Sequence, residues 1–410
     1  MGPAGKSSRA KRPVARKSRR GQAGREQESR ASRLAGPPSD SLSQELRRDV
    51  STILVTGAGG PIGACLVAHL AREGYQVVAA DQTEAEIPIP RPESRVKVLA
   101  GDLADPSFVS ACLEGVDAVL HAFCVAEPNR AYGALAPLNV EAPRLLYKEA
   151  RRRGVRRFFH FSSALVYKRG QGPIAEHGTL EPENDFEQTL LDAERIFLAG
   201  PASGLPLVTV LRIAVPYGPR NRALFSSLAT LPPLAKAMGS RYIPAGAGPR
   251  ISLVHAEDAA RAALFLLFHP QSYGEIFNVA DREPLSLGEC INVAMEVYGL
   301  KPLKPGTPYP PSTLLHSILP RTEPGEIFDP LDRVGQTLWE RMVRKRALKK
   351  ALSAGLEREI ALFGKRDLVL DCGKLRSLGF RLRYPRFRKG WEHTMTWYQK
   401  HRWIPRPEEL

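Results

Sequence analysis

A glycine-rich turn carries the clearest chemical signal in the chain. The apolar run Thr52–Thr56 leads into Gly57-Ala58-Gly59-Gly60-Pro61-Ile62-Gly63, and a helical pattern follows over Ile62–Arg72. In a strand–turn–helix context, the first glycine permits a tight turn, the middle one lets the backbone approach phosphates, and the third allows close packing. The free N–H groups of the helix N-terminus favour an anion. The turn therefore predicts a dinucleotide site that includes Gly57, Gly60, Pro61, Ile62 and Gly63.

Asp81 indicates which dinucleotide would bind. It directly follows the next apolar run, Gln76–Ala80. A carboxylate at this place accepts hydrogen bonds from ribose hydroxyls and repels a 2′-phosphate. We therefore expect NAD, rather than NADP, with Asp81 on the ribose.

The elements that must position these residues alternate regularly up to residue 213. Apolar runs rich in β-branched residues predict strands, and the segments between them have helical spacing, which together indicate a parallel sheet covered on both faces. The predicted strands are Thr52–Thr56, Gln76–Ala80, Val96–Leu99, Ala118–His121, Arg157–Phe161 and Leu207–Ile213, and the helices are Ile62–Arg72, Ser107–Leu113, Leu138–Arg153 and Glu187–Leu198. The fold class is thus α/β, a doubly wound Rossmann sheet, over 49–213. For residues 214–410 we expect mainly a smaller, mixed substrate domain, with some segments returning to the NAD-binding core.

Composition excludes several classes of protein. The chain has 410 residues, 43% of them hydrophobic, and a net charge of +16 that is concentrated at its two ends. The slightly acidic middle argues against a specific nucleic-acid binder. The 5 cysteines are scattered and form no CxxC pair, which predicts no metal site and a reducing, cytoplasmic location. No apolar run approaches the roughly 20 residues of a membrane span.

Residues 1–48 are basic and contain few large apolar side chains, so we expect a disordered tail. A phosphate-binding arm, an organelle transit peptide and a contact with anionic membrane remain alternatives for this segment.

Further motifs along the chain resemble a known family. Thr56–Gly63 resembles the TGxxGxxG of extended short-chain dehydrogenases/reductases, the epimerase–dehydratase group. The other matching segments, in order, are Gly101-Asp102-Leu103, Val119-Leu120-His121-Ala122, Leu138-Asn139-Val140, Phe161-Ser162-Ser163-Ala164-Leu165-Val166-Tyr167, Val215–Pro219, His255–Ala260, Gly274–Val279 and Lys374–Phe380. The likeness covers roughly residues 51–405. It implies that Asp102 and Leu103 lie at the adenine, that His121 and Ala122 lie along the dinucleotide, and that Asn139 and Ser163 are active-site residues.

The proton-transferring pair of this family is replaced in the chain. The resemblance places a Tyr-x-x-x-Lys pair on the helix after Ser163, and the matching positions hold Phe186 and Leu190. None of the 11 tyrosines is followed by Lys at the fourth position, so no shifted copy restores the motif. Positioned acid–base catalysis contributes about 10²–10⁴ in rate, and Phe and Leu provide none of it. Ser163 and Asn139 remain as the expected catalytic residues.

Two other departures narrow the substrate. Ala164 and Leu165 occupy the positions where dehydratases of the family carry Asp-Glu, which disfavours elimination chemistry. Ala214 stands where sugar-nucleotide enzymes usually have Asn, so the chain resembles the 3β-hydroxysteroid dehydrogenase-like branch more closely. We therefore expect a hydrophobic alcohol or ketone as the substrate.

The segment 335–364 combines an apolar stripe with many Lys and Arg residues, which predicts an amphipathic helix. It would pack as a lid on the substrate cleft or, alternatively, lie on an anionic membrane as a peripheral contact.

Taken together, the sequence predicts an NAD-dependent oxidoreductase with a non-standard active site, and a homodimer is a further expectation. The alternative is a catalytically silent NAD(H)-binding sensor or scaffold.

Overall fold

The computed structural model of the chain describes most of the segment after residue 49. The described residues are 2, 50–84, 87, 95–200, 204–222, 226–237, 248–301, 324–354 and 366–410. The side chains of residues 324–334 are not part of this description. Apart from Gly2, the predicted tail over residues 1–48 lies outside the described residues. Residues Asp40–Leu410 form one unit.

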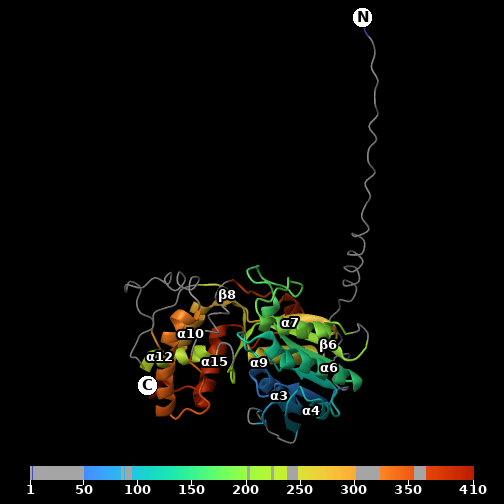
Figure 1. Cartoon of the computed structure of the whole chain (residues 1–410), viewed down its shortest axis with the longest axis horizontal. Coiled ribbons are helices and arrows are strands. Elements are labelled where there is room, and N and C mark those ends of the chain that lie inside the picture. Colours follow the sequence, from blue (N-terminus) through green and yellow to red (C-terminus); the bar gives the residue numbers. More distant parts are fainter. Residues whose placement is uncertain are drawn as a thin grey trace. The chain divides into compact units, whose positions relative to one another are not determined.

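A seven-stranded, all-parallel sheet forms the centre of this unit, in the order β10-β6-β5-β4-β1-β2-β3. Figure 1 labels β6 of this sheet among the surrounding helices. The strands are β1 (Thr52–Thr56), β2 (Gln76–Asp81), β3 (Val96–Ala100), β4 (Ala118–His121), β5 (Arg157–Ser163), β6 (Leu207–Ile213) and β10 (Glu275–Val279). The strand order reverses between β1 and β4, which is where doubly wound sheets bind ligands at the carboxyl ends of their strands. All six predicted strands are confirmed.

Helices cover both faces of the sheet. Along β1, Ile53 and Val55 belong to one hydrophobic core, whereas Leu54 belongs to the other. The first core includes apolar residues of α3 (Pro61–Glu73) and α9 (Ala256–Leu267), and the second includes residues of α4 (Pro106–Cys112), α6 (Ala142–Arg152) and α7 (Asp185–Leu198). Every residue of β4 and most residues of β1 are buried, so these central strands are mainly apolar, as the sequence predicted.

One predicted helix differs in detail. The segment expected to be a single helix over Leu138–Arg153 is part of a longer run, in which α5 (Tyr132–Ala136) continues into a π-helical turn, η3 (Pro137–Glu141), before α6 begins. The π-helical turn carries Asn139 inward, where its side chain is buried. Such turns are frequent at functional sites.

The remaining elements build the C-terminal part. Two small sheets pair β7 (Val215–Tyr217) with β9 (Leu253–His255) and β8 (Arg250–Ile251) with β11 (Leu285–Ser286). The helices are α8 (Leu231–Ala237), α10 (Leu287–Val297), α12 (Pro324–Lys345), α14 (Gly373–Ser377) and α15 (Phe387–Lys400). Short helical turns are η4 (Ala164–Val166), η5 (Ser227–Thr230), η6 (Pro270–Ser272) and η7 (Pro407–Glu409).

The helix predicted over residues 335–364 was wrong in its extent, because α12 ends at Lys345. The chain then turns back, with Ala347 and Lys350 in left-handed conformation, and the Trp339 indole donates a hydrogen bond to the Leu352 carbonyl. Trp339, Met342 and Leu352 are buried in the protein's own core, which agrees with local packing of the stripe. Residues 355–365 lie outside the described residues.

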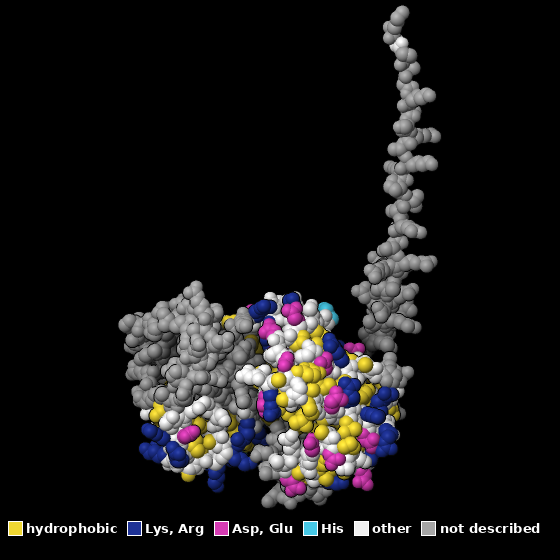
Figure 2. All heavy atoms as spheres, viewed as in Figure 1, with side chains coloured by type: hydrophobic (Ala, Val, Ile, Leu, Met, Phe, Trp, Pro, Cys, Tyr) yellow, Lys and Arg dark blue, Asp and Glu magenta, His cyan; other side chains and the backbone are white. Residues whose placement is uncertain are grey.

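Basic side chains of α12 and α15 face outward. Arg341, Arg344, Arg388 and Lys400 are exposed, and Figure 2 shows Lys and Arg side chains along the edge of this region. Within the described ranges, none of the helices combines the length and hydrophobicity needed to cross a membrane.

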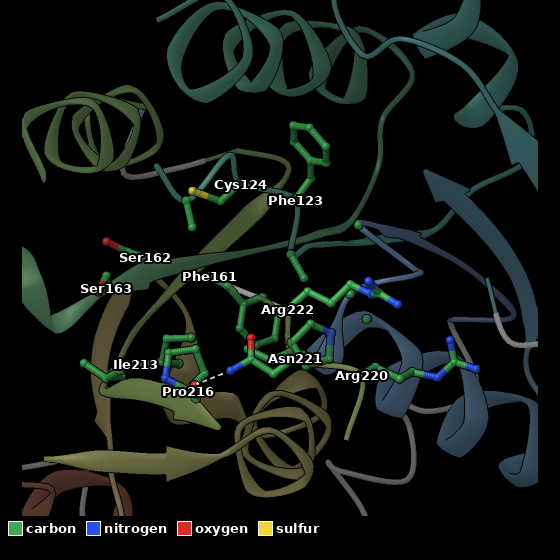
Figure 3. A pocket seen from close by; sticks show the side chains of 18 of the residues that line it. Phe123, Cys124, Phe161, Ser162, Ser163, Ile213, Pro216, Arg220, Asn221 and Arg222 are labelled. Atoms are coloured by element: carbon green, nitrogen blue, oxygen red, sulfur yellow. Dashed lines mark hydrogen bonds between the residues drawn. The ribbon is translucent and has the colours of Figure 1, made fainter. Parts of the chain in front are cut away.

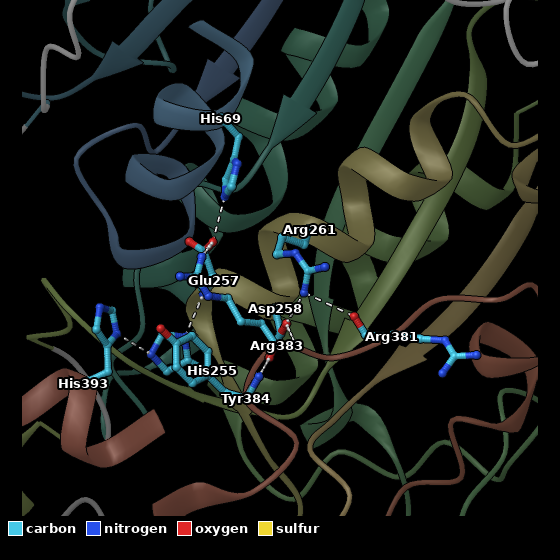
Figure 4. A network of polar contacts seen from close by, with 9 residues as sticks. All are labelled: His69, His255, Glu257, Asp258, Arg261, Arg381, Arg383, Tyr384 and His393. Atoms are coloured by element: carbon cyan, nitrogen blue, oxygen red, sulfur yellow. Dashed lines mark hydrogen bonds and ion pairs between the residues drawn. The ribbon is translucent and has the colours of Figure 1, made fainter. Parts of the chain in front are cut away.

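A polar network fixes α3 against the C-terminal segment (Figure 4). The Glu257 carboxylate lies 2.8 Å from His69 on α3 and 3.3 Å from Arg383. Asp258 accepts hydrogen bonds of 2.7 Å from the backbone N–H groups of Arg383 and Tyr384. These contacts hold the helix that follows the glycine turn in place.

Two histidines in the core predict sensitivity to acid. His121 and His160 are stacked at 5.6 Å, and within the described residues both nitrogens of His160 and Nε2 of His121 lack hydrogen-bond partners. Burial lowers the pKa of His121 to about 4, and burial together with His121 lowers the pKa of His160 well below its usual value. Below a pH of about 6.5 the unfolded chain therefore binds more protons than the folded one. The free energy of unfolding decreases as the pH is lowered through this range.

We expect His160→Leu to flatten this pH dependence and to raise the denaturation midpoint at pH 5. Leu fills a similar volume without unsatisfied nitrogens. Urea unfolding between pH 5 and 8 is the measurement, with the exposed His177→Gln as the control. Equal pH profiles for His160→Leu and wild type would contradict the expectation.

Candidate functional site

A cavity of about 380 Å³ opens where β1, β4 and β5 end (Figure 3). It is lined by the glycine turn, by the strand ends and by the loop after β7. The lining residues outside the turn are Asp81, Ala122, Phe123, Cys124, Ala126, Phe161, Ser162, Ser163, Leu165, Phe186, Leu190, Ile213, Val215, Pro216, Arg220, Asn221 and Arg222. Polar groups of the turn and apolar side chains of α7 thus share one cavity.

The backbone of the glycine turn approaches neighbouring segments so closely that two of its positions require glycine. Gly57 has a φ of +68°, and a Cβ atom there would lie 2.8 Å from the Ala122 carbonyl oxygen. A Cβ atom on Gly63 would lie 2.0 Å from the Gly57 oxygen, so only glycine fits between strand and helix. Gly60 caps α3, and Pro61 begins it. All five predicted residues of the turn, including Ile62, line the cavity.

Asp81 braces this turn from the end of β2. Its carboxylate accepts hydrogen bonds of 2.8 Å from the Gly59 N–H and 2.7 Å from the Gln82 N–H. The side chain is half-buried and lines the cavity, where further lone pairs are available to ribose hydroxyls.

We expect Asp81→Asn to narrow or reverse the preference for NADH over NADPH. The substitution removes the negative charge that repels a 2′-phosphate and retains the size of the side chain. Titration calorimetry with both dinucleotides measures the ratio of their affinities. An unchanged ratio would show that Asp81 does not face the ribose.

The other residues predicted to contact the cofactor lie at different depths. Ala122 lines the cavity, but Asp102, Leu103 and His121 do not. The His121 ring lies in the core, with Nδ1 2.7 Å from the Thr56 hydroxyl. Asp102 accepts a hydrogen bond from the Ala104 N–H, and Leu103 is buried in the core. Their contact with a dinucleotide remains a prediction.

Of the two predicted catalytic residues, Ser163 lines the cavity and Asn139 does not. Ser163 lines the cavity at the end of β5, and its hydroxyl accepts a 3.2 Å hydrogen bond from the Leu165 N–H. Asn139 is buried: its amide oxygen accepts a hydrogen bond from the Val125 N–H, and its amide nitrogen donates to the Val125 carbonyl and the Thr189 hydroxyl. Asn139 therefore holds the loop that precedes the lining residue Ala126.

The two positions expected to hold the Tyr-x-x-x-Lys pair face the cavity. Phe186 and Leu190 on α7 line it and are 3% and 5% exposed. Phe161, Leu165 and Ile213 also line the cavity, so much of its wall is apolar. A lipophilic group can bury its surface there.

A buried polar network lies beside the cavity and was not predicted. The Arg212 guanidinium pairs with Glu194 and donates a 2.9 Å hydrogen bond to the Tyr167 hydroxyl. Glu194 also accepts a 2.8 Å hydrogen bond from Ser162, which lines the cavity. The Tyr167 hydroxyl donates to Asn278, and burial raises its pKa to about 12. The Tyr167 side chain is thus buried, with its hydroxyl hydrogen-bonded to Arg212 and Asn278.

Comparison with known proteins gives the family. The model of the NAD dependent epimerase/dehydratase family matches residues 53–280. The sterol demethylase protein B of Methylococcus capsulatus is 36% identical over 173 residues, which cover 41% of this chain and 52% of that protein. The 3 beta-hydroxysteroid dehydrogenase/Delta 5-->4-isomerase of Mycobacterium tuberculosis is 26% identical over 277 residues, covering 63% and 71% of the two chains.

A solved structure shares the fold. MoeE5 in complex with UDP-glucuronic acid and NAD has a TM-score of 0.62 and 23% identity, over 85% of this chain and 99% of that one. The predicted doubly wound fold is confirmed, and so is NAD as the cofactor of the family. On the family match over residues 53–280 and the fold, the chain belongs to the NAD-dependent epimerase/dehydratase family.

Proposed function

We propose that the protein is an NAD-dependent oxidoreductase that acts on a hydrophobic alcohol or ketone without the family's usual proton-transferring pair. The observation that carries the proposal is the single cavity in which the glycine turn and Asp81 meet an apolar wall that contains Phe186 and Leu190. The names of the two relatives, a sterol demethylase protein and a hydroxysteroid dehydrogenase, support a lipophilic substrate.

Each part of the cavity has a proposed task. The backbone of residues 57–63 binds the pyrophosphate, and Asp81 binds the ribose of the adenosine half. A nicotinamide cofactor bound there supplies or accepts a hydride. The Ser163 hydroxyl, at the carboxyl end of β5, holds the substrate oxygen, while Asn139 positions the neighbouring loop through Val125.

The apolar wall determines which substrates fit and how fast they react. Phe186 and Leu190 cannot donate a proton, so the carbonyl oxygen must receive it from water or from Ser163. We expect turnover to be about 10²–10⁴ slower than with a positioned acid–base pair. A charged sugar would lose its hydration against this wall, whereas a steroid-like ring system or long-chain ketone would not.

The test is the absorbance of NADH during incubation with lipophilic ketones and a hydrophilic sugar control. We expect slow oxidation of NADH with lipophilic ketones, loss of that activity in Ser163→Ala, and no effect of Ser110→Ala on α4. Oxidation only with the sugar would overturn the proposed substrate class. Tight NADH binding without oxidation by any ketone would favour a sensor or scaffold.

A further inference from the structure

Two arginines on the loop after β7 line the same cavity as the glycine turn. Arg220 and Arg222 flank the buried Asn221, and all three belong to the lining. Figure 3 shows the two arginine side chains extending away from Ser162 and Ser163, on the other side of the view.

Aromatic side chains of the C-terminal segment fix both guanidinium groups. The Arg222 guanidinium lies 4.0 Å from the centre of the Trp403 ring and donates a 2.8 Å hydrogen bond to the Lys350 carbonyl. The Arg220 guanidinium lies 5.8 Å from the centre of the Trp397 ring. The Arg222 guanidinium is thus oriented by stacking on an indole ring, and the Arg220 guanidinium lies at the outer range of a cation–π contact.

The loop backbone is braced as well. The Tyr398 hydroxyl lies 2.8 Å from the Asn221 carbonyl oxygen and 3.1 Å from that of Gly218. Arg220 has a φ of +67°, which is uncommon for a residue with a side chain. Strained conformations of this kind persist where the surroundings hold them, often at ligand-binding sites.

The charge of the cavity points to an anion. Its lining contains two arginines and one carboxylate, Asp81, whose oxygens already accept hydrogen bonds from Gly59 and Gln82. Burial and Glu257 raise the pKa of the Cys65 thiol on α3, and the Arg220 charge opposes them. The positive charge of Arg220 therefore acts close to the helix that the glycine turn begins.

We propose that Arg220 and Arg222 bind the pyrophosphate of the dinucleotide from the β7 side of the cavity, as partners of the backbone N–H groups of the glycine turn. The inference rests on the proposed binding of NAD(H). The two arginines would also bring positive charge to a cavity in which Leu190 stands where the family has a lysine. Bidentate hydrogen bonds to phosphate oxygens are a typical use of arginine.

The test compares the affinities of NADH and ADP-ribose for wild type and for Arg220→Gln/Arg222→Gln by titration calorimetry. ADP-ribose contains the pyrophosphate but no nicotinamide. We expect the double variant to bind both ligands about tenfold to a hundredfold more weakly than wild type. We also expect a smaller dependence of its affinity on salt concentration. Arg151→Gln, which removes an exposed charge on α6, should bind like wild type.

The outcomes separate this inference from the proposed function. Affinities of the double variant within about twofold of wild type for both ligands would overturn it. If wild type binds neither NADH nor ADP-ribose, the proposed function itself is wrong. Should the glutamine variant not fold, Arg220→Lys/Arg222→Lys retains the charges. Retained affinity and salt dependence in that variant support the inference, and loss of the wild-type salt dependence overturns it.

Discussion

Gly60→Val is expected to abolish NADH binding while leaving the protein folded. Gly60 has φ −69° and ψ 170°, a conformation open to any residue. A Cβ atom there would approach only the Gly57 carbonyl oxygen, at 3.2 Å. The two methyl groups of Val would extend into the cavity, where the pyrophosphate must approach the backbone. Calorimetry should therefore detect no NADH binding, and thermal unfolding should remain cooperative.

Gly63→Ala is the matched comparison on the same turn. Its Cβ atom would meet the Gly57 carbonyl at 2.0 Å, so the turn itself must move. We expect this variant to lose stability as well as binding, whereas Gly60→Val loses binding alone. Wild-type NADH affinity in Gly60→Val would contradict the placement of the pyrophosphate.

Arg212→Leu is expected to cause the largest loss of stability. Arg212 and Glu194 are 2% and 1% exposed, and the remaining hydrogen bond to the Glu194 carboxylate comes from Ser162. Removing one partner of a buried ion pair typically costs about 3–5 kcal/mol, because the other charge stays buried without compensation. The free energy of unfolding in urea is the measurement.

Two variants control this prediction. Arg195→Leu breaks the exposed pair with Asp192 on the same helix and should cost at most about 1 kcal/mol. Arg212→Leu/Glu194→Leu removes both buried charges and should recover much of the lost stability. A loss in Arg212→Leu no larger than in Arg195→Leu would show that the pair contributes no more than a surface contact.

The sequence predicted the elements whose signals are local. β1, the glycine turn and α3 follow from an apolar run, glycine spacing and helical periodicity within about twenty residues. For the same reason the predicted turn residues and Asp81 line one cavity. The sequence predicted a doubly wound parallel sheet but not the order of its strands, because strand pairing depends on contacts between distant segments.

Residues whose partners are remote in sequence were harder to predict. Asn139 resembles an active-site residue, but its hydrogen bonds to Val125 and Thr189 depend on how three segments pack. The Arg212–Glu194 pair joins a strand to a helix and leaves no spacing pattern. The end of α12 at Lys345 was missed because the apolar stripe continues on a segment that folds back, as the bond from Trp339 to Leu352 shows.

We propose that this cavity supports hydride transfer although Phe186 and Leu190 replace the proton-transferring pair. The most direct measurement uses NADH in which both hydrogens at C4 of the nicotinamide are deuterium, incubated with a lipophilic ketone and the purified protein. Mass spectrometry of the alcohol product should show one deuterium on the former carbonyl carbon, in amounts that fall in Ser163→Ala. NADH that binds tightly but transfers no deuterium to any ketone of the panel would contradict the account.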